Sequence, residues 1–386
     1  MGFYSEYLDR KMEMAQVNRE RKAQLHRISA LRGDRDVLVF AADLSKNEAP
    51  ISMDYTDLLP IGDQLANLHG AAIDVILETP GGSGEVAEDI VQLLRDKYGE
   101  VAFIVPGWAK SAGTIMVMAG DDILMGATSA IGPIDAQLFR EGKVFSADAL
   151  LEGMEKIKKE VEQTGRLNKA YIPILQAISP GELQNAENLL KFARELVTEW
   201  LMRHKFRNWT HHSSGQPVTD DERQTKAAEI AAELCNHRKW LTHGRSIKIG
   251  DLRQMGLKIT DYSEHPALSD AIGRYYTLLR MTFSGNIYKV IETPDSQIYR
   301  FHGARVPLPA AVTLAAAEVA HIEVACAKCN GRFMIQANLG KLIPLQQGCL
   351  PFPPNNVVNC PNCGNPVDVS DVRRQIEAQS KKPVVS

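Results

Sequence analysis

Residues 101–118 read VAFIVPGWAKSAGTIMVM, and this stretch decides the fold. The apolar run Val101–Val105 is typical of a strand that is buried on both faces. Pro106-Gly107 ends the predicted strand. Ser111 then opens a short and almost wholly apolar helix that extends to Met118. The stretch therefore predicts a buried strand, a sharp turn with a serine, and a buried helix.

Ser111 has two interpretations. In the first, residues 109–113 form a nucleophile elbow, in which Ala109 stands where G-x-S-x-G has its first glycine. The helix N-terminus favours negative charge near the serine Oγ, and the Ala112 N–H is placed to join an oxyanion hole. In the second interpretation, Ser111 is an ordinary serine that caps the start of a helix.

A glycine-rich turn precedes the serine turn. Residues 79–84 read TPGGSG and come directly after the predicted strand Ile73–Leu77. Glycine lets the backbone turn sharply and present its N–H groups, because no Cβ blocks the approach. Such a turn can hold a phosphate, although the GKS or GKT ending of a P-loop does not follow. It can also present donors to an oxyanion, or be a simple tight turn.

Strands and helices alternate on both sides of these turns. Further strands are predicted at Val37–Ala42, Ile123–Met125 and Ser129–Ile131, and helices at 58–68 and from residue 86 onward. Alternation of this kind predicts an α/β fold with right-handed crossovers and a largely parallel sheet.

The two turns together resemble those of the Clp protease proteolytic subunit and signal peptide peptidase A. The segments KSAGT at 110–114, AGDDI at 119–123 and SAIGPID at 129–135 are more similar still to the serine dehydrogenase proteinase family, which has the same fold. WLTH at 240–243, before MGL at 255–257, extends the resemblance.

The resemblance covers roughly residues 35 to 265, apart from much of a helical insertion. It implies a Clp/crotonase-type core of ββα units in a spiral, a peptidase activity and assembly into homo-oligomers. It also implies an oxyanion hole formed by Gly81 or Gly82 together with Ala112.

The histidine of Clp-type peptidases is missing from its usual strand. The matching stretch, residues 134–138, reads IDAQL. We therefore expect His243 to be the general base, because Clp-like folds bring a triad member towards the serine at this point, and Asp135 to orient its ring. The alternatives are a base lysine, from Lys110, Lys143 or the helical insertion, and a His243 that only satisfies backbone groups near a helix start.

Four of the six cysteines form two CxxC pairs, Cys326 with Cys329 and Cys360 with Cys363. Each pair can place two thiolates on one metal, and two such knuckles complete a tetrahedral site. We expect one structural Zn²⁺, because four thiolates leave no open position. A redox pair or unrelated cysteines is the alternative interpretation.

The expected organisation has five parts. They are an N-terminal helix at 1–34, the peptidase core at 35–275 with its helical insertion at about 148–236, a linker with a β-hairpin at 276–320, a zinc-ribbon-like module at 321–368 and a disordered tail at 369–386.

The composition excludes some other classes. The net charge of −3 gives no global attraction to nucleic acid or acidic membranes. The first residues are polar, which argues against a secretory signal, and no run of about 18 apolar residues exists. We expect a cytoplasmic protein without a membrane partner.

The leading hypothesis is a serine peptidase that hydrolyses peptide bonds through an acyl-enzyme on Ser111. A crotonase-type acyl-CoA enzyme shares the fold but needs no nucleophilic serine. A third hypothesis is a non-catalytic oligomeric scaffold whose zinc module binds protein or nucleic acid. The expected partners are a peptide or protein substrate, further copies of the chain and a protein bound by the zinc module.

Overall fold

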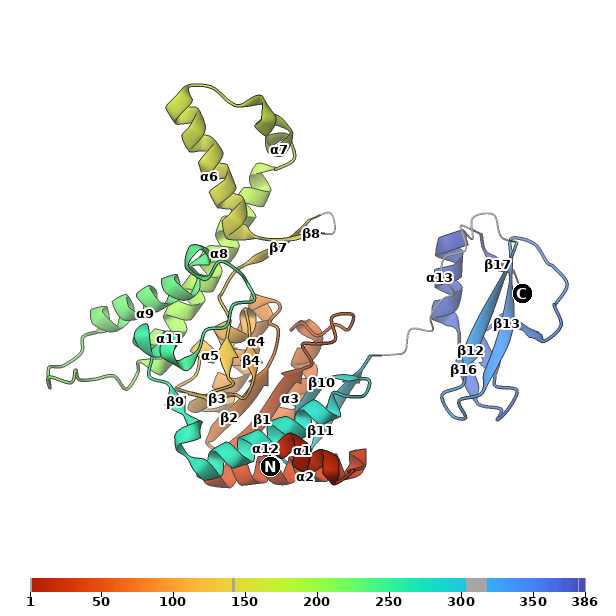
Figure 1. Cartoon of the computed structure of the whole chain (residues 1–386), viewed down its shortest axis with the longest axis horizontal. Helices are drawn as coiled ribbons and strands as arrows, with labels where there is room; N and C mark the ends of the chain where they lie inside the picture. Colours follow the sequence, from red (N-terminus) through yellow and green to blue (C-terminus); the bar gives the residue numbers. More distant parts are fainter. Residues whose placement is uncertain (1, 141–142, 303–317, 381, 386) are drawn as a thin grey trace. The chain divides into compact units, whose positions relative to one another are not determined.

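A computed structural model describes residues 2–140, 143–302, 318–380 and 382–385, without the side chains of residues 139, 140, 143 and 379. The chain divides into two compact units, Met1–His302 and Gly303–Ser386. Each unit is described by itself (Figure 1).

The first unit is built on a seven-stranded sheet with the order β11-β10-β1-β2-β3-β5-β9. Neighbouring strands are parallel from β1 to β9, as the alternation of strands and helices predicts. The parallel strands are β1 (Asp36–Ala42), β2 (Ala72–Glu78), β3 (Glu100–Val105), β5 (Asp122–Met125) and β9 (Thr260–Asp261).

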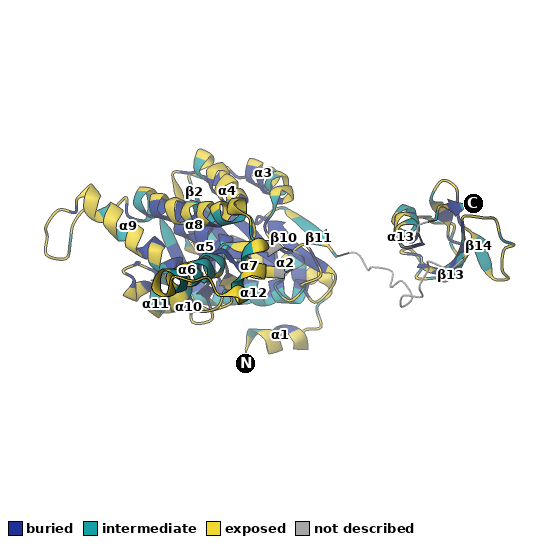
Figure 2. Ribbon diagram, turned by 90° about the horizontal axis from the view of Figure 1, so that it is seen from above, coloured by how far each residue is buried: buried dark blue, intermediate teal, exposed yellow. Residues whose placement is uncertain are grey.

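Helices cover both faces of the sheet, which explains the continuous apolar runs in its strands. In β1, Val37 and Val39 pack towards α2 (Met14–Leu31) and α12 (Pro266–Thr282). Leu38 and Phe40 belong to the core on the other face. That core includes residues of α3 (Leu58–Ala66), α4 (Gly84–Lys97) and α5 (Ala112–Met118). Figure 2 shows the buried strands beneath partly exposed helices.

A second, shorter ladder crosses the turns that follow the main strands. β4 (Trp108–Ala109) pairs with β6 (Ala130–Ile131), and single bridges join Met53 to Gly82, Thr79 to Ala109 and Ile131 to Ile247. Strand, short extended segment and helix thus recur, as in β3, β4 and α5. This arrangement is the expected ββα spiral, and it aligns the glycine turn, the serine turn and the segment after His243.

The predicted hairpin linker belongs to the core sheet instead. β10 (Ile287–Glu292) and β11 (Gln297–Phe301) form the hairpin, but β10 also pairs antiparallel with β1. All of β10 is buried, including Lys289, whose ammonium is 2.8 Å from the Asp57 carboxylate. Pairing with the open edge of β1 satisfies the backbone of β10 and draws it into the core. The rest of the expected linker, residues 303–317, lies outside the described residues.

The N-terminal segment forms two helices rather than one. α1 (Phe3–Asp9) ends before Lys11, which has a positive φ of 46°, and α2 follows. α2 lies on its own domain, where Arg21 forms a fully buried ion pair with Glu292 at 2.7 Å.

The helical insertion begins with the hairpin β7 (Gln137–Arg140) and β8 (Lys143–Ser146). Its helices are α6 (Ala147–Thr164), α7 (Ile172–Gln176), α8 (Pro180–Trp200), a π-helix at Leu201–Lys205 and α9 (Asp220–Leu234). α6 and α7 form an arm that projects from the sheet (Figure 1). The end of α8 packs in the core through Leu196, Val197 and Trp200. α10 (His237–Trp240) and α11 (Ile249–Gln254) follow the insertion.

The second unit contains a four-stranded sheet, a two-stranded sheet and a helix. The strands are β12 (Val319–Ala325), β13 (Arg332–Leu339), β14 (Cys349–Pro351) and β17 (Val384–Val385), with β15 (Val357–Asn359) pairing β16 (Pro366–Asp368). We expected a disordered tail at 369–386, but α13 (Ser370–Ser380) and β17 occupy it. Val369, Ile376 and Val384 are buried in the same core as Ile322 and Ile335, so the polar composition hides an apolar face.

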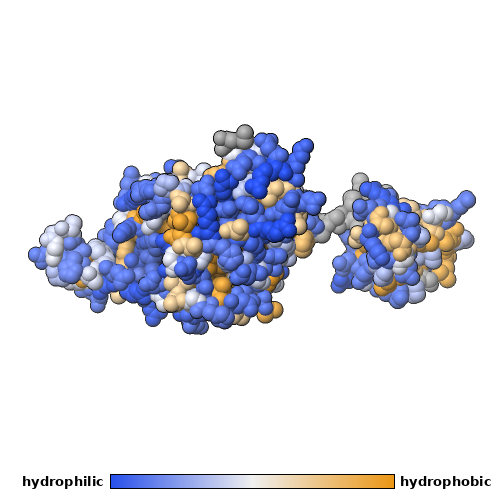
Figure 3. Space-filling model, turned by 90° about the horizontal axis from the view of Figure 1, so that it is seen from below, coloured by the Kyte–Doolittle hydropathy of each residue, from blue (hydrophilic) through white to orange (hydrophobic). Residues whose placement is uncertain are grey.

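None of the described helices combines the length and the apolar character that a bilayer crossing requires. The face seen in Figure 3 is mainly hydrophilic, with apolar patches scattered over it.

Candidate active site and cysteine cluster

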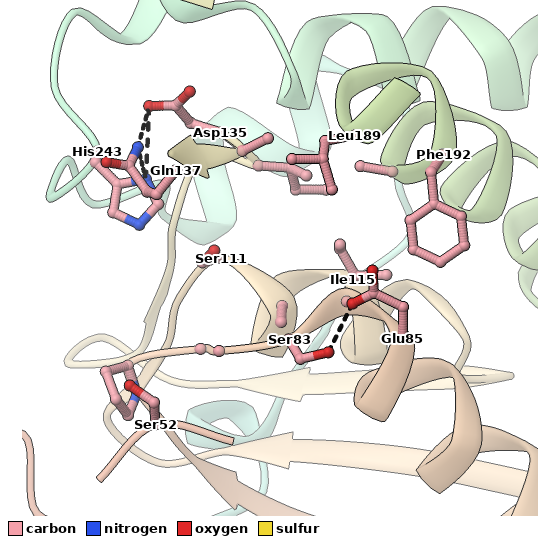
Figure 4. Close-up of a pocket in the computed structure, with 18 residues that line it drawn as sticks. Ser52, Ser83, Glu85, Ser111, Ile115, Asp135, Gln137, Leu189, Phe192 and His243 are labelled. Carbon is pink, nitrogen blue, oxygen red and sulfur yellow. Dashed lines mark hydrogen bonds and ion pairs between the residues drawn. The ribbon is translucent and has the colours of Figure 1, made fainter. Parts of the chain in front are cut away.

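Ser111 lies in the turn between β4 and α5 in a strained conformation. Its φ of 51° and ψ of −118° are rarely adopted by residues other than glycine. A conformation of this kind costs about 1–3 kcal/mol and clusters at functional sites. A helix-cap serine requires a hydrogen bond from a backbone N–H of the helix to its side chain, and the side chain of Ser111 accepts no such bond from α5. The hydroxyl instead faces a cavity (Figure 4).

The residues after Ser111 hold this turn in place. A Cβ on Gly113 would lie 2.4 Å from the Thr79 Cγ2, so only glycine lets the two turns approach. The Thr114 hydroxyl donates to the Ala109 carbonyl at 2.9 Å and accepts from the Gly132 N–H at 3.0 Å. The AGT sequence after the serine is therefore the local cause of the strained turn.

The glycine turn packs directly against the serine turn. Gly81 has a φ of 100°, and a Cβ on it would lie 2.6 Å from the Ser111 Cβ. Gly82 has a φ of 150°, and a Cβ on it would lie 2.2 Å from the Met53 carbonyl oxygen. Both positions thus require glycine, for conformation and for space.

The three N–H groups that we expected at an oxyanion hole differ in their partners. The Gly81 N–H donates to the Thr79 Oγ1 at 3.1 Å. Among the described residues, the N–H groups of Gly82 and Ala112 have no acceptor. Gly82 and Ala112 are therefore the two donors that remain free beside Ser111.

A cavity of about 400 Å³ lies over the two turns (Figure 4). Ser111, Asp135 and His243, predicted from distant parts of the sequence, all line it. One wall is apolar and combines residues of the core with residues of α8: Ile115, Ile134, Leu189, Phe192 and Ala193. At its edge, the Ser83 hydroxyl donates to Glu85 at 2.6 Å.

Asp135 is buried and surrounded by donors. It accepts hydrogen bonds from the Ser146 hydroxyl at 2.6 Å and the Gln137 amide at 2.7 Å. The Nδ1 atoms of His237 and His243 lie 3.6 and 3.7 Å from its Oδ2. Burial raises the pKa of Asp135, but the interactions with His243 and Ser146 outweigh burial, so the net pKa is lowered. Asp135 therefore stays ionised beside the imidazole.

His243 lies across the cavity from Ser111, and no hydrogen bond joins the two side chains in the described structure. Catalytic hydrogen bonds are often long before substrate binds, so this geometry suits a base that moves closer in the complex.

Lys110, proposed as an alternative base, is not among the residues that line the cavity. None of the described residues that line it is a lysine. The Lys110 ammonium points to residues 244–246. The side chain of Lys143 lies outside the described residues.

Sequence reasoning missed three partners of Asp135, namely Gln137, Ser146 and His237. Gln137 follows Asp135 by two residues in an extended segment, so period-two alternation is a signal that could have found it. Ser146 and His237 reach Asp135 only through the tertiary fold.

The four predicted cysteines converge in the second unit. Their Sγ atoms all lie within 4.8 Å of one another. Cys326 is 3.6 Å from Cys363, and Cys329 is 3.7 Å from Cys360. Four thiols at these distances fit one tetrahedral metal ion. Hydrogen bonds from the Gly331 N–H, the Asn362 amide and Cys363 together lower the pKa of the Cys329 thiol to about 6.

Both cysteine pairs form the same knuckle. The Asn330 N–H donates to the Cys326 carbonyl at 2.8 Å, and the Gly364 N–H donates to the Cys360 carbonyl at 2.8 Å. Asn330 and Gly364 each have a positive φ, of 55° and 70°. The Asn-Gly and Gly-Asn steps therefore shape the knuckles, whereas Cys349 lies outside the cluster.

The first unit contains a ClpP-like domain. Residues 66–173 match the family model described as ClpP-like SDH-type serine proteinase. This match confirms the predicted family resemblance over a segment that holds both turns and Asp135, and it ends before His243.

Two uncharacterized proteins of Methanocaldococcus jannaschii are similar to this chain. MJ1495 is 27% identical over 187 residues, which cover 48% of this chain and 51% of the relative. MJ0137 is 30% identical over 161 residues, which cover 41% of this chain and 53% of the relative. The chain thus spans about half the length of the curated relatives it matches.

Proposed function

We propose that this protein is a serine endopeptidase that hydrolyses peptide bonds through an acyl-enzyme on Ser111. The observation that carries the proposal is the strained Ser111 facing a cavity, with two free N–H groups beside it. A helix-cap serine or a simple scaffold has no need of such strain. An acyl-CoA enzyme of this fold has no need of the serine.

The proposed reaction begins when the Ser111 Oγ attacks the scissile carbonyl and its proton passes to His243. With Nδ1 turned towards Asp135, Nε2 is the nitrogen that takes this proton. The N–H groups of Gly82 and Ala112 stabilise the developing oxyanion, and Gly81 shapes the turn that presents them. His243 then gives the proton to the leaving amine, and water hydrolyses the ester by the same steps in reverse order.

Covalent labelling tests this proposal. A serine-directed fluorophosphonate is expected to label the wild-type protein once per chain and to leave Ser111→Ala unlabelled. Peptide hydrolysis by Ser111→Ala should fall by about three orders of magnitude or more. Ser52→Ala is the matched control, because Ser52 is another serine that lines the same cavity. Equal labelling of wild type and Ser111→Ala would assign the nucleophile elsewhere.

We propose that the cysteine cluster holds one structural Zn²⁺. The four thiolates would hold the ion without leaving an open position, so its role there is to stabilise the fold of the second unit. Thiolate ligands and the free thiol of Cys235 suit a reducing compartment, the cytoplasm. We propose that this unit also binds a protein partner.

We also propose a homo-oligomer that uses the arm of α6 and α7. Ala147 is the only buried residue of α6, although the sequence of this helix has one apolar face. Ile172 and Ile174 on α7 and Leu167 before it are exposed. A second copy covering this apolar surface would be detected by sedimentation, and Ile172→Asp with Ile174→Asp should yield monomers.

A further inference from the structure

Lys110, the residue before Ser111, places its ammonium among four oxygen atoms. They are the carbonyls of Gly244 at 3.3 Å, Arg245 at 3.0 Å and Ile131 at 3.4 Å, and the hydroxyl of Ser246 at 3.2 Å. An ammonium group has three donors and no acceptor, so a ring of oxygens is a suitable environment. Three of the four belong to the segment directly after His243.

This segment, residues 244–248, is attached to the core at two further points. Ile131 and Ile247 exchange backbone hydrogen bonds of 3.1 and 2.9 Å. Lys248 donates to the carbonyls of Thr128 at 3.1 Å and Ser129 at 2.9 Å. Among these described contacts, only that of Lys110 comes from the serine turn.

The path of the Lys110 side chain is set by Gly132. A Cβ on Gly132 would lie 2.7 Å from the Lys110 Cδ. The aliphatic stem therefore passes over a glycine, and this contact directs the ammonium to residues 244–246 and away from the reacting hydroxyl. The KSAG and AIGP segments are thus linked through one side chain.

We propose that Lys110 is a positioning residue that ties the turn carrying the nucleophile to the segment carrying His243. It thereby sets the distance between Ser111 and His243. This inference rests on the proposed peptidase activity. In this role Lys110 is not the general base, because its N–H donors bind carbonyls and a hydroxyl that do not line the cavity.

The charge of Lys110 gives this role a pH dependence. Burial, and then repulsion by Lys248, lower the pKa of Lys110 to about 8. Lys248 is the charged group that lowers the pKa of Lys110. The hydrogen-bond partners of the ammonium are the neutral carbonyls of Ile131, Gly244 and Arg245 and the Ser246 hydroxyl. The ammonium binds carbonyls more strongly than the neutral amine does. The catalytic rate is therefore expected to fall as the pH rises through about 8, whereas a lysine base would make it rise.

Two substitutions of Lys110 test the proposal. Lys110→Met should lower kcat by about 10- to 100-fold with little change in KM, since a misplacement of about 1 Å can cost two orders of magnitude. Lys110→Arg keeps a charge that does not titrate below a pH of about 12. It should recover much of kcat and should remove the fall above pH 8.

Lys248→Met is the matched control. It removes the hydrogen bonds of another lysine that attaches the same segment to the core. It also removes the repulsion that acts on Lys110. We expect kcat within about threefold of wild type, because a surface substitution away from the reacting groups has small effects. The alkaline fall should move to higher pH.

The outcomes separate this inference from the proposed function. An unlabelled, inactive wild type would refute the peptidase itself. A labelled, active wild type whose rate and pH profile are unchanged in Lys110→Met would refute only the positioning role. A rate that rises through pH 8 with an inactive Lys110→Arg would make Lys110 the base instead. If Lys110→Met does not fold, the pH–rate profiles of wild type, Lys110→Arg and Lys248→Met test the positioning role of Lys110.

Discussion

At the scale of single residues, two histidines lie within reach of the Asp135 carboxylate. The Nδ1 atoms of His237 and His243 are at nearly equal distances from its Oδ2, 3.6 and 3.7 Å. His243 lines the cavity, and His237 does not. Gln137 bonds the same oxygen and lies 3.4 Å from the Nδ1 of His243. The amide therefore helps to orient both the carboxylate and the ring.

This difference predicts different effects of the two histidines. His243→Gln should reduce peptide hydrolysis by about three orders of magnitude or more, and Asp135→Asn by about 10⁴, because the ring loses its orientation. His237→Gln should stay within a few fold of wild type. Steady-state kinetics of the three variants check this. Loss of activity in His237→Gln with retained activity in His243→Gln would exchange the two roles.

The backbone of Ser111 predicts a conflict between stability and activity. Glycine adopts a φ of 51° without strain, whereas alanine carries the same penalty as serine. The free energy of unfolding of Ser111→Gly should therefore exceed that of Ser111→Ala by about 1 kcal/mol. This value already includes the stability that glycine loses through its flexibility in the unfolded chain. Denaturant unfolding of both inactive variants measures the difference. An equal or lower stability of Ser111→Gly would show that the turn is not strained.

At the scale of elements, α8 connects the insertion to the site. Its end packs in the core, and its middle turns supply Leu189 and Phe192 to the apolar wall of the cavity. The insertion therefore forms part of the cavity wall and is not only a cover.

Phe192→Ala should weaken the use of peptides with a large apolar side chain at this wall. We expect kcat/KM to fall by about tenfold or more for such peptides, mainly through KM, because a hydrophobic subsite contributes about 1–3 kcal/mol. Peptides with small residues should change less. Leu190→Ala is the control, since Leu190 is on the same helix but outside the cavity lining. An equal loss for all peptides would point to a general effect on folding.

At the scale of the whole molecule, each unit has its own hydrophobic core. The cores of the first unit contain the sheet and the proposed active site, whereas the second unit buries a separate cluster around Ile322 and Ile335. Residues 1–302 alone should therefore fold and react with the fluorophosphonate. Circular dichroism and labelling of the truncated chain test this, and an unfolded product would show that the units depend on each other.

Metal analysis tests the second unit. The purified protein should contain about one zinc per chain, and the pair Cys360→Ser and Cys363→Ser should lose it. Because the core of this unit is small, loss of the metal should unfold it while the first unit keeps its labelling. A zinc content near zero in metal-replete protein would contradict the proposal.

The sequence by itself determined the features that depend on neighbouring residues. Apolar runs fix buried strands, and glycines at 81 and 82 fix the first turn, because backbone conformation there is set by local sterics. The spacing within each CxxC pair likewise sets a knuckle that can bind metal. The α/β class and the cysteine cluster were predictable for this reason, whereas the ββα core was expected from the family resemblance.

Only the tertiary structure decided which distant groups meet and where their donors point. It placed His237 and Ser146 on Asp135 and directed Lys110 to residues 244–246. It also drew the β10–β11 hairpin into the sheet and packed α13 and β17 into the core of the second unit. Side-chain directions and pairings between remote segments depend on close packing of the whole core, and no short stretch of sequence contains that information.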